Sequence, residues 1–152
     1  MRDSDDVLLL RPAWPGSGFA PGALHPPAGA TRPGAGIVVV THALAQAADA
    51  AACAWFRDTV LPRARALGAR PLAVFATEDA PNNFPALPVR EGEHVLVSVR
   101  AFQDVGAHAR FADAIRTDAR WQRDVAGVLA PRSIAPPQVR RLQPCVRSAV
   151  RG

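Results

Sequence analysis

The length of 152 residues, of which 49% are hydrophobic and 20% charged, suits one globular domain with a core and leaves little room for two. The net charge of +5 rests on 18 basic residues that are all arginine, and they are scattered singly along the chain except for the adjacent pair Arg140-Arg141. Nucleic-acid binders gather such charges into a patch or stripe. We therefore expect no nucleic-acid partner.

The N-terminus and the cysteines argue against export and against a metal site. The opening "MRDSDDVLLLRPA" has acidic residues before a short apolar run, whereas a secretory signal has basic residues before about seven or more apolar ones. No apolar run approaches the ~20 residues of a membrane-spanning helix, so we expect a cytoplasmic protein without a membrane partner. Cys53 and Cys145 show neither CxxC nor Cys/His spacing, and His94 and His108 are isolated. We expect no metal, no disulfide and no cofactor.

Residues 1–35 are expected to form an N-terminal strand followed by a tether. Residues 7–13 share a spaced pattern with the end of the chain, which predicts a short strand: Val7 with Val139, Leu10 with Leu142 and Pro12 with Pro144. Residues 14–36 are too rich in Gly and Pro for a helix or a central strand. The domain proper is then residues 36–150.

The domain begins with a strand and an amphipathic helix. "IVVVTHAL" (37–44) is β-branched and short, which is typical of a buried strand. In residues 48–68 an apolar stripe recurs at helical spacing, and Gly68 follows as a stop signal; the stripe consists of Cys53, Phe56, Val60, Ala64 and Leu67.

Two further strands, a helical region and a closing strand complete the chain. "PLAVFAT" (71–77) and "HVLVSVRAF" (94–102) predict strands, and in the latter Val95, Val97 and Val99 alternate with Leu96, Ser98 and Arg100. Residues 104–130 predict helix with a break near Asp118, with His108, Phe111 and Ile115 on one face before the break. Residues 138–148 predict a last strand, in which Pro144 favours an edge position.

The order βαββαβ is that of the ferredoxin-like α+β fold, with a four-stranded antiparallel sheet and helices on one face. The other face of such a sheet needs a cover. The N-terminal segment or a second copy of the chain can supply it, and dimerisation into a dimeric α/β barrel is the economical solution.

Three stretches carry a family resemblance: "NNFPALPVREGEHVLVSVRAF" (82–102), "ARFADAIRTDARWQRDVAGVLAPRS" (109–133) and "RRLQPCVRS" (140–148). Together they resemble the NIPSNAP family of the dimeric α/β-barrel superfamily. Members often look like tandem pairs of such repeats, so the resemblance implies that a single repeat pairs as a homodimer. It implies no agreed reaction, since relatives in the superfamily include cofactor-free monooxygenases, haem-degrading enzymes and small ligand-binding proteins.

The loop before the third strand is unusually well specified. Its prolines stiffen it, Asn82 and Asn83 can turn it by bonding the backbone, and Phe84 can pin it to the body of the domain. Arg90 can contact Glu91 or Glu93. We expect a dimer clasp or pocket rim, with gating of a substrate as the alternative.

A polar trio on neighbouring strands is the candidate site. His42 on the first strand and Ser98 with Arg100 on the third can share one face of the sheet. A buried Arg100 needs an anion, since an unpaired buried charge costs several kcal/mol. Two interpretations remain open. Arg100 pairs with an acidic residue of a partner chain and His42 is a core histidine, or Arg100 holds a substrate oxyanion while His42 is the general base.

Two functions follow from these observations. The first is a small-ligand binding or interaction module, with a small hydrophobic or aromatic ligand held between the sheet and the helices. The alternative is a cofactor-independent monooxygenase or isomerase that acts on a phenolic, quinol or polyketide-type metabolite.

Overall fold

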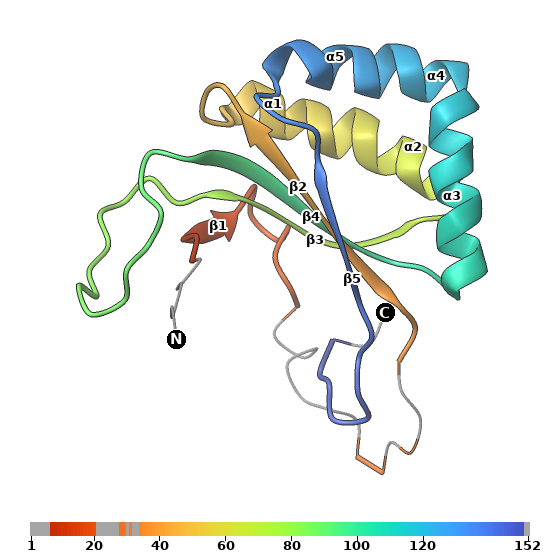
Figure 1. Ribbon diagram of the computed structural model, residues 1–152, viewed down its shortest axis with the longest axis horizontal. Helices are drawn as coiled ribbons and strands as arrows, with labels where there is room; N and C mark the ends of the chain where they lie inside the picture. Colours follow the sequence, from red (N-terminus) through yellow and green to blue (C-terminus); the bar gives the residue numbers. More distant parts are fainter. Residues whose placement is uncertain (1–6, 21–27, 30, 32–33, 151–152) are drawn as a thin grey trace.

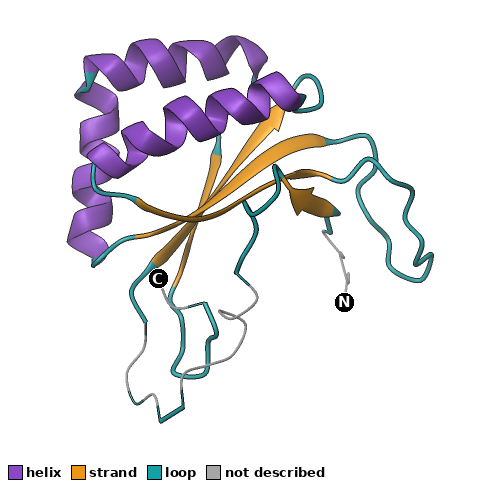
Figure 2. Ribbon diagram, turned by 180° about the vertical axis from the view of Figure 1, so that it is seen from behind, coloured by secondary structure: helices purple, strands orange, loops and turns teal. Residues whose placement is uncertain are grey.

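The structure is a computed structural model that describes residues 7–20, 28–29, 31 and 34–150. Part of the expected tether, residues 21–27, 30 and 32–33, lies outside the described residues. The protein has two layers, a twisted antiparallel sheet and a set of helices that all lie on one of its faces (Figure 1). The view from behind shows loops on the opposite side of the sheet (Figure 2).

The sheet has five strands in the order β1-β3-β4-β2-β5, and every neighbouring pair is antiparallel. The strands are β1 Leu10–Pro12, β2 Ile37–Leu44, β3 Arg70–Thr77, β4 His94–Ala101 and β5 Gln138–Leu142. Without β1, the order and connections are those of the ferredoxin-like fold. The antiparallel α+β architecture with helices on one face is thus confirmed.

The expectation of four strands is wrong. The N-terminal segment returns to the sheet, and β1 pairs with the outer edge of β3 through Leu10 opposite Thr77 and Pro12 opposite Phe75. Pro12 has no amide hydrogen, so its place on an edge strand is the one that sheets tolerate. At the other edge, the closing strand ends at Leu142 and does not reach residue 148.

The first helical segment runs without interruption through α1 Ala50–Trp55, a π-helical turn Phe56–Val60 and α2 Leu61–Ala66. It begins at Asp49, whose carboxylate accepts a hydrogen bond from the Ala52 amide at 2.7 Å. It ends before Gly68, whose φ of +98° is accessible to glycine.

The second helical region divides at Asp118, as expected. The helix α3 Val105–Thr117 stops there because Asp118 adopts an extended backbone, and the Asp118 carboxylate then accepts a hydrogen bond from the Trp121 amide at 2.6 Å. The next run comprises α4 Ala119–Trp121, a π-helical turn Gln122–Ala126, α5 Gly127–Leu129 and a 3-10 turn Ala130–Arg132. The break lets this run fold back over the sheet beside α1 and α2 (Figure 1).

The main core lies between the sheet and the helices of both helical regions. Phe56, Val60 and Ala64 are almost fully inaccessible to solvent, and they pack in one cluster with Val74 and Leu96 of the sheet. The apolar stripe expected from the sequence therefore faces the sheet.

A second, smaller cluster occupies the opposite face of the sheet. Ile37, Ala73 and Val99 are buried there, and Phe19 and Val150 from the terminal segments pack against them. The chain itself therefore covers part of the face that was expected to receive a second copy. Among the described residues, no helix combines the length and apolar character that a membrane crossing requires.

Candidate functional site

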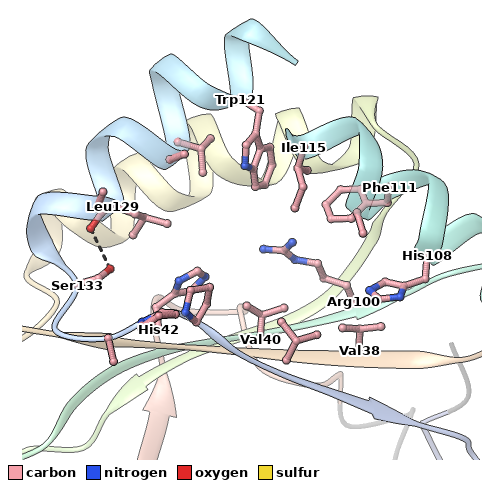
Figure 3. A pocket seen from close by; sticks show the side chains of 18 of the residues that line it. Val38, Val40, His42, Arg100, His108, Phe111, Ile115, Trp121, Leu129 and Ser133 are labelled. Carbon is pink, nitrogen blue, oxygen red and sulfur yellow. Dashed lines mark hydrogen bonds between the residues drawn. The ribbon is translucent and has the colours of Figure 1, made fainter. Parts of the chain in front are cut away.

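A cavity of about 760 Å³ lies between the sheet and the second helical region (Figure 3). Strands β2, β4 and β5 form its floor, the helical region from α3 to α5 forms its roof, and the segment after α5 lines one end. Its lining is mainly aliphatic and aromatic: Val38, Val40, His42, Arg100, Phe102, His108, Phe111, Ala112, Ile115, Trp121, Val125, Ala126, Leu129, Ala130, Ser133, Ile134, Ala135, Pro136, Pro137, Val139 and Arg141.

Strand alternation brings the polar floor residues to this cavity. In the antiparallel ladder Val38 lies opposite Arg100 and His42 opposite Leu96, so the even-numbered residues of both strands point toward the helices. On α3 the helical repeat brings His108 and Phe111 to the same side. After the break at Asp118, Trp121 completes the roof.

Arg100 is the most unusual of these side chains. Only 4% of the residue is exposed, its guanidinium points into the cavity (Figure 3), and no described residue accepts a hydrogen bond from it. Its guanidinium carbon lies 5.7 Å from the centre of the Phe111 ring and 6.0 Å from that of Trp121, which are cation-π distances. Burial lowers the pKa of Arg100 to about 10, so the group remains a cation at neutral pH.

His42 stands on the same floor as a neutral imidazole. Burial, and after it the charge of Arg100, lower the pKa of His42 from about 6.5 to about 4. Its ring meets that of Phe56 edge to face at a centroid distance of 6.5 Å. An uncharged imidazole can donate or accept one hydrogen bond in the cavity.

His108 was not a site candidate from the sequence, although its helical spacing with Phe111 and Ile115 indicated a shared face. Its ring packs edge to face on Phe102 at 4.9 Å, and its buried Nδ1 has no hydrogen-bond partner. Its pKa is lowered by burial first, and then by the charges of Arg141 and Arg100. None of the lining residues is an Asp or Glu, so the cavity carries positive charge without a carboxylate.

Comparison with known proteins identifies the fold of this chain. No family model matches the chain, and none of the curated proteins matches it. Among solved structures, an uncharacterized NIPSNAP-like domain protein from Burkholderia xenovorans aligns over 72% of this chain and 84% of its own, with a TM-score of 0.55 and 17% sequence identity. This chain has a NIPSNAP-like fold. The resemblance drawn from the sequence is confirmed at that level, and a shared fold by itself transfers no activity.

Ser98 lies apart from the other two members of the polar trio. It shares the helix-facing side of the sheet with His42 and Arg100, between Val40 and Val74, but it does not line the cavity. It is 1% exposed, and its hydroxyl has no hydrogen-bond partner. The structure therefore brings two members of the trio to the cavity and leaves the third in the closely packed interior.

The loop between β3 and β4 lies outside the cavity, and none of its residues lines it. The Asn82 side chain donates to the Leu87 carbonyl at 2.8 Å and accepts from the Phe84 amide at 2.9 Å, so it turns the backbone as expected. Arg90 contacts Glu93 at 3.0 Å. Phe84 is 61% exposed, so it does not pin the loop to the domain.

The remaining candidates form no cluster in the described part of the chain. Asn83 and Glu91 are exposed in the same loop. Cys53 is buried, Cys145 is exposed, and both are free thiols. Within the described residues, no group of three His, Cys, Asp or Glu side chains is placed to hold a metal ion.

Proposed function

We propose that the protein binds a small, largely apolar molecule in the cavity between the sheet and the second helical region. The observation that carries this proposal is a cavity of about 760 Å³ with a mainly aliphatic and aromatic lining and a few polar groups. Ligand sites typically measure about 300–1,000 Å³ and have this mixture of walls.

The contrast between the two halves of the interior supports a binding role. Protein interiors are normally packed with few voids, and the half beneath α1 and α2 follows that rule, with Phe56 and Ala64 at 0% exposure. In the other half, alanines at 112, 126 and 130 line open space. Small side chains on the roof therefore keep room for a ligand.

The edge of the cavity also has the character of an entrance. Ile134 and Val139 both line it, and they are 70% and 53% exposed. Large apolar side chains at such a mouth can contact an apolar molecule as it enters. Exposed apolar surface of this kind commonly marks a binding site.

A neutral fluorescent probe tests the proposal without any contribution from charge. N-phenyl-1-naphthylamine is expected to bind the wild-type protein with enhanced emission. Ala126→Phe, which adds a ring to the roof of the cavity, is expected to abolish this binding. Ala119→Phe places the same ring on an exposed position of α4 and is the matched control. Absence of probe binding to the wild type, or unchanged binding to Ala126→Phe, would contradict the proposal.

A second candidate function is a cofactor-independent monooxygenase or isomerase acting on a phenolic, quinol or polyketide-type metabolite. The neutral His42 beside a cationic Arg100 favours it, because an imidazole can take a phenolic proton while a guanidinium holds the oxyanion. However, a general base works best with a pKa near the operating pH, and the His42 pKa of about 4 lies well below neutrality. This makes binding the stronger proposal.

The enzyme hypothesis has its own measurement. Oxygen uptake with a naphthol or a quinol, or isomerisation followed by absorbance, should occur with wild-type protein and be lost in His42→Gln. No turnover with either substrate class would leave the binding function alone.

We further propose that the partner of this chain is a second copy, which meets the sheet face opposite the helices. Val39 and Phe75 on that face are only partly buried by the terminal segments. The exposed Phe84 on the loop between β3 and β4 offers an additional apolar contact for such a partner.

A further inference from the structure

We propose that the cavity selects apolar molecules that carry a single carboxylate, and that this carboxylate binds the Arg100 guanidinium. The inference rests on the proposed binding function and adds the chemical class of the ligand. It comes from the charge arrangement in the cavity, which the lining and the contacts of Arg100 define.

A buried cation without an anion is the starting observation. Arg100 is 4% exposed, its Nε has no hydrogen-bond partner, and no described residue forms an ion pair with it. A charge of this kind is normally paired inside a protein, because its transfer from water is strongly unfavourable. The cavity lining offers no carboxylate for the pair. A bound molecule can supply it.

A partner chain is a poorer source of that carboxylate. Arg100 projects from the helix-facing side of the sheet, and its guanidinium lies beneath Phe111 and Trp121 of the same chain. The face left for a second copy is the opposite one, where Ile37 and Val99 form the separate cluster. The anion therefore has to enter the cavity, and a small molecule does so through the mouth at Ile134 and Val139.

The geometry of a guanidinium suits a carboxylate. Its planar fork donates two parallel hydrogen bonds to the two carboxylate oxygens. His42 and His108 both have lowered pKa values, so they add no positive charge at neutral pH, and the other cation of the lining, Arg141, is exposed to solvent. One carboxylate neutralises the buried Arg100, whereas a phosphate monoester brings nearly two negative charges into a mainly aliphatic and aromatic lining.

The lining also indicates how the rest of the molecule lies. From Arg100, the open space extends beneath the roof toward His42, Leu129 and Ser133 (Figure 3). The Ser133 hydroxyl already donates to the Leu129 carbonyl at 2.9 Å, so its one hydrogen is taken. The apolar body of an aromatic acid or of a medium-chain fatty acid fits this end.

Matched pairs of ligands test the inference. Calorimetry would compare 2-naphthoate with 2-naphthalenemethanol, and decanoate with decanol, on wild type, Arg100→Met and Arg140→Met. Arg140 lies on β5 opposite Val39, on the other face of the sheet, and is exposed. We expect the wild type and Arg140→Met to prefer each acid by about tenfold or more, as for a charge-assisted hydrogen bond. Arg100→Met should lose this preference and still bind the alcohols.

Each other outcome has a defined meaning. Equal affinity of the wild type for acid and alcohol, or an acid preference that persists in Arg100→Met, would overturn the carboxylate inference while leaving the binding function in place. No binding of acid, alcohol or neutral probe would overturn the binding function itself.

A measurement on the wild type alone covers the case in which Arg100→Met does not fold. Carbon-13 NMR of carboxyl-labelled 2-naphthoate across a pH series gives the pKa of the bound acid. Contact with Arg100 should lower that pKa below its value in free solution. A raised pKa, as for an acid bound in its neutral form, would contradict the inference.

Discussion

Replacement of Arg100 by Met should stabilise the ligand-free protein. Methionine keeps an unbranched apolar stem of similar reach and removes the charge. The burial that lowers the Arg100 pKa to about 10 corresponds to a penalty of roughly 3 kcal/mol on the charged form. With Arg100 only 4% exposed, little solvent screening reduces that penalty.

The contacts that Arg100 does make offset part of this penalty. Two aromatic faces, those of Phe111 and Trp121, stand at cation-π distance and together stabilise the charge by about 1–2 kcal/mol. The net expectation for Arg100→Met is a gain of about 1–2 kcal/mol in the free energy of unfolding. For a chain of this length that corresponds to a rise of about 2–6 °C in Tm.

The assay is urea denaturation and calorimetry of protein that has been unfolded and refolded to remove bound molecules. Arg140→Met, an exposed change on the other face of the sheet, should remain within about 0.5 kcal/mol of the wild type. A loss of 1 kcal/mol or more in Arg100→Met would refute the reasoning. Arg100 would then be a cation that the fold itself uses, and no ligand would be needed to complete it.

Three further predictions concern His42, Ser98 and Phe84. Between pH 6.5 and pH 4 the unfolded chain binds one more proton at His42 than the folded chain, so the free energy of unfolding falls as the pH is lowered through that window, by about 3 kcal/mol in all. Urea midpoints at pH 7 and pH 4.5 should show a smaller loss of stability in His42→Gln than in the wild type. An equal loss in the two proteins would exclude His42 as its source. Ser98→Ala removes a buried hydroxyl without a partner, so it should raise the free energy of unfolding by up to about 1 kcal/mol and leave probe binding unchanged, whereas weaker binding would place Ser98 in the site. For the proposed homodimer, native mass spectrometry should show wild-type dimers and a shift toward monomer in Phe84→Ser, and a monomeric wild type would contradict the dimer.

Local patterns were enough to predict most of the elements. The strand Ile37–Leu44 is found at its expected residues because a short β-branched run directly after a Gly- and Pro-rich stretch is typical of a strand. The division at Asp118 followed in the same way, since an Asp between two apolar helical repeats favours a cap. The pairing of β1 with β3 was missed because it joins residues more than sixty positions apart, and only three residues take part.

Only the floor of the cavity could be predicted from the sequence. Alternation along β2 and β4 indicates that His42, Ser98 and Arg100 share a face, and the ladder register gives that arrangement. Whether each side chain lies beneath the closely packed α1 and α2 or beneath the roof of the cavity depends on how the helices cross the sheet. The sequence of the strands carries no information on that crossing, so the separate place of Ser98 could not be inferred.

The difference between the two halves of the interior explains why an unpaired cation can persist in this fold. The first helical segment packs Phe56, Val60 and Ala64 tightly against the sheet. The second half holds the cavity and retains Arg100 without an anion. Natural proteins commonly give up stability at functional sites, and the ligand-free Arg100→Met variant measures how much is given up here. If the variant is more stable and no longer distinguishes an acid from its alcohol, the same guanidinium accounts for both the lost stability and the selectivity.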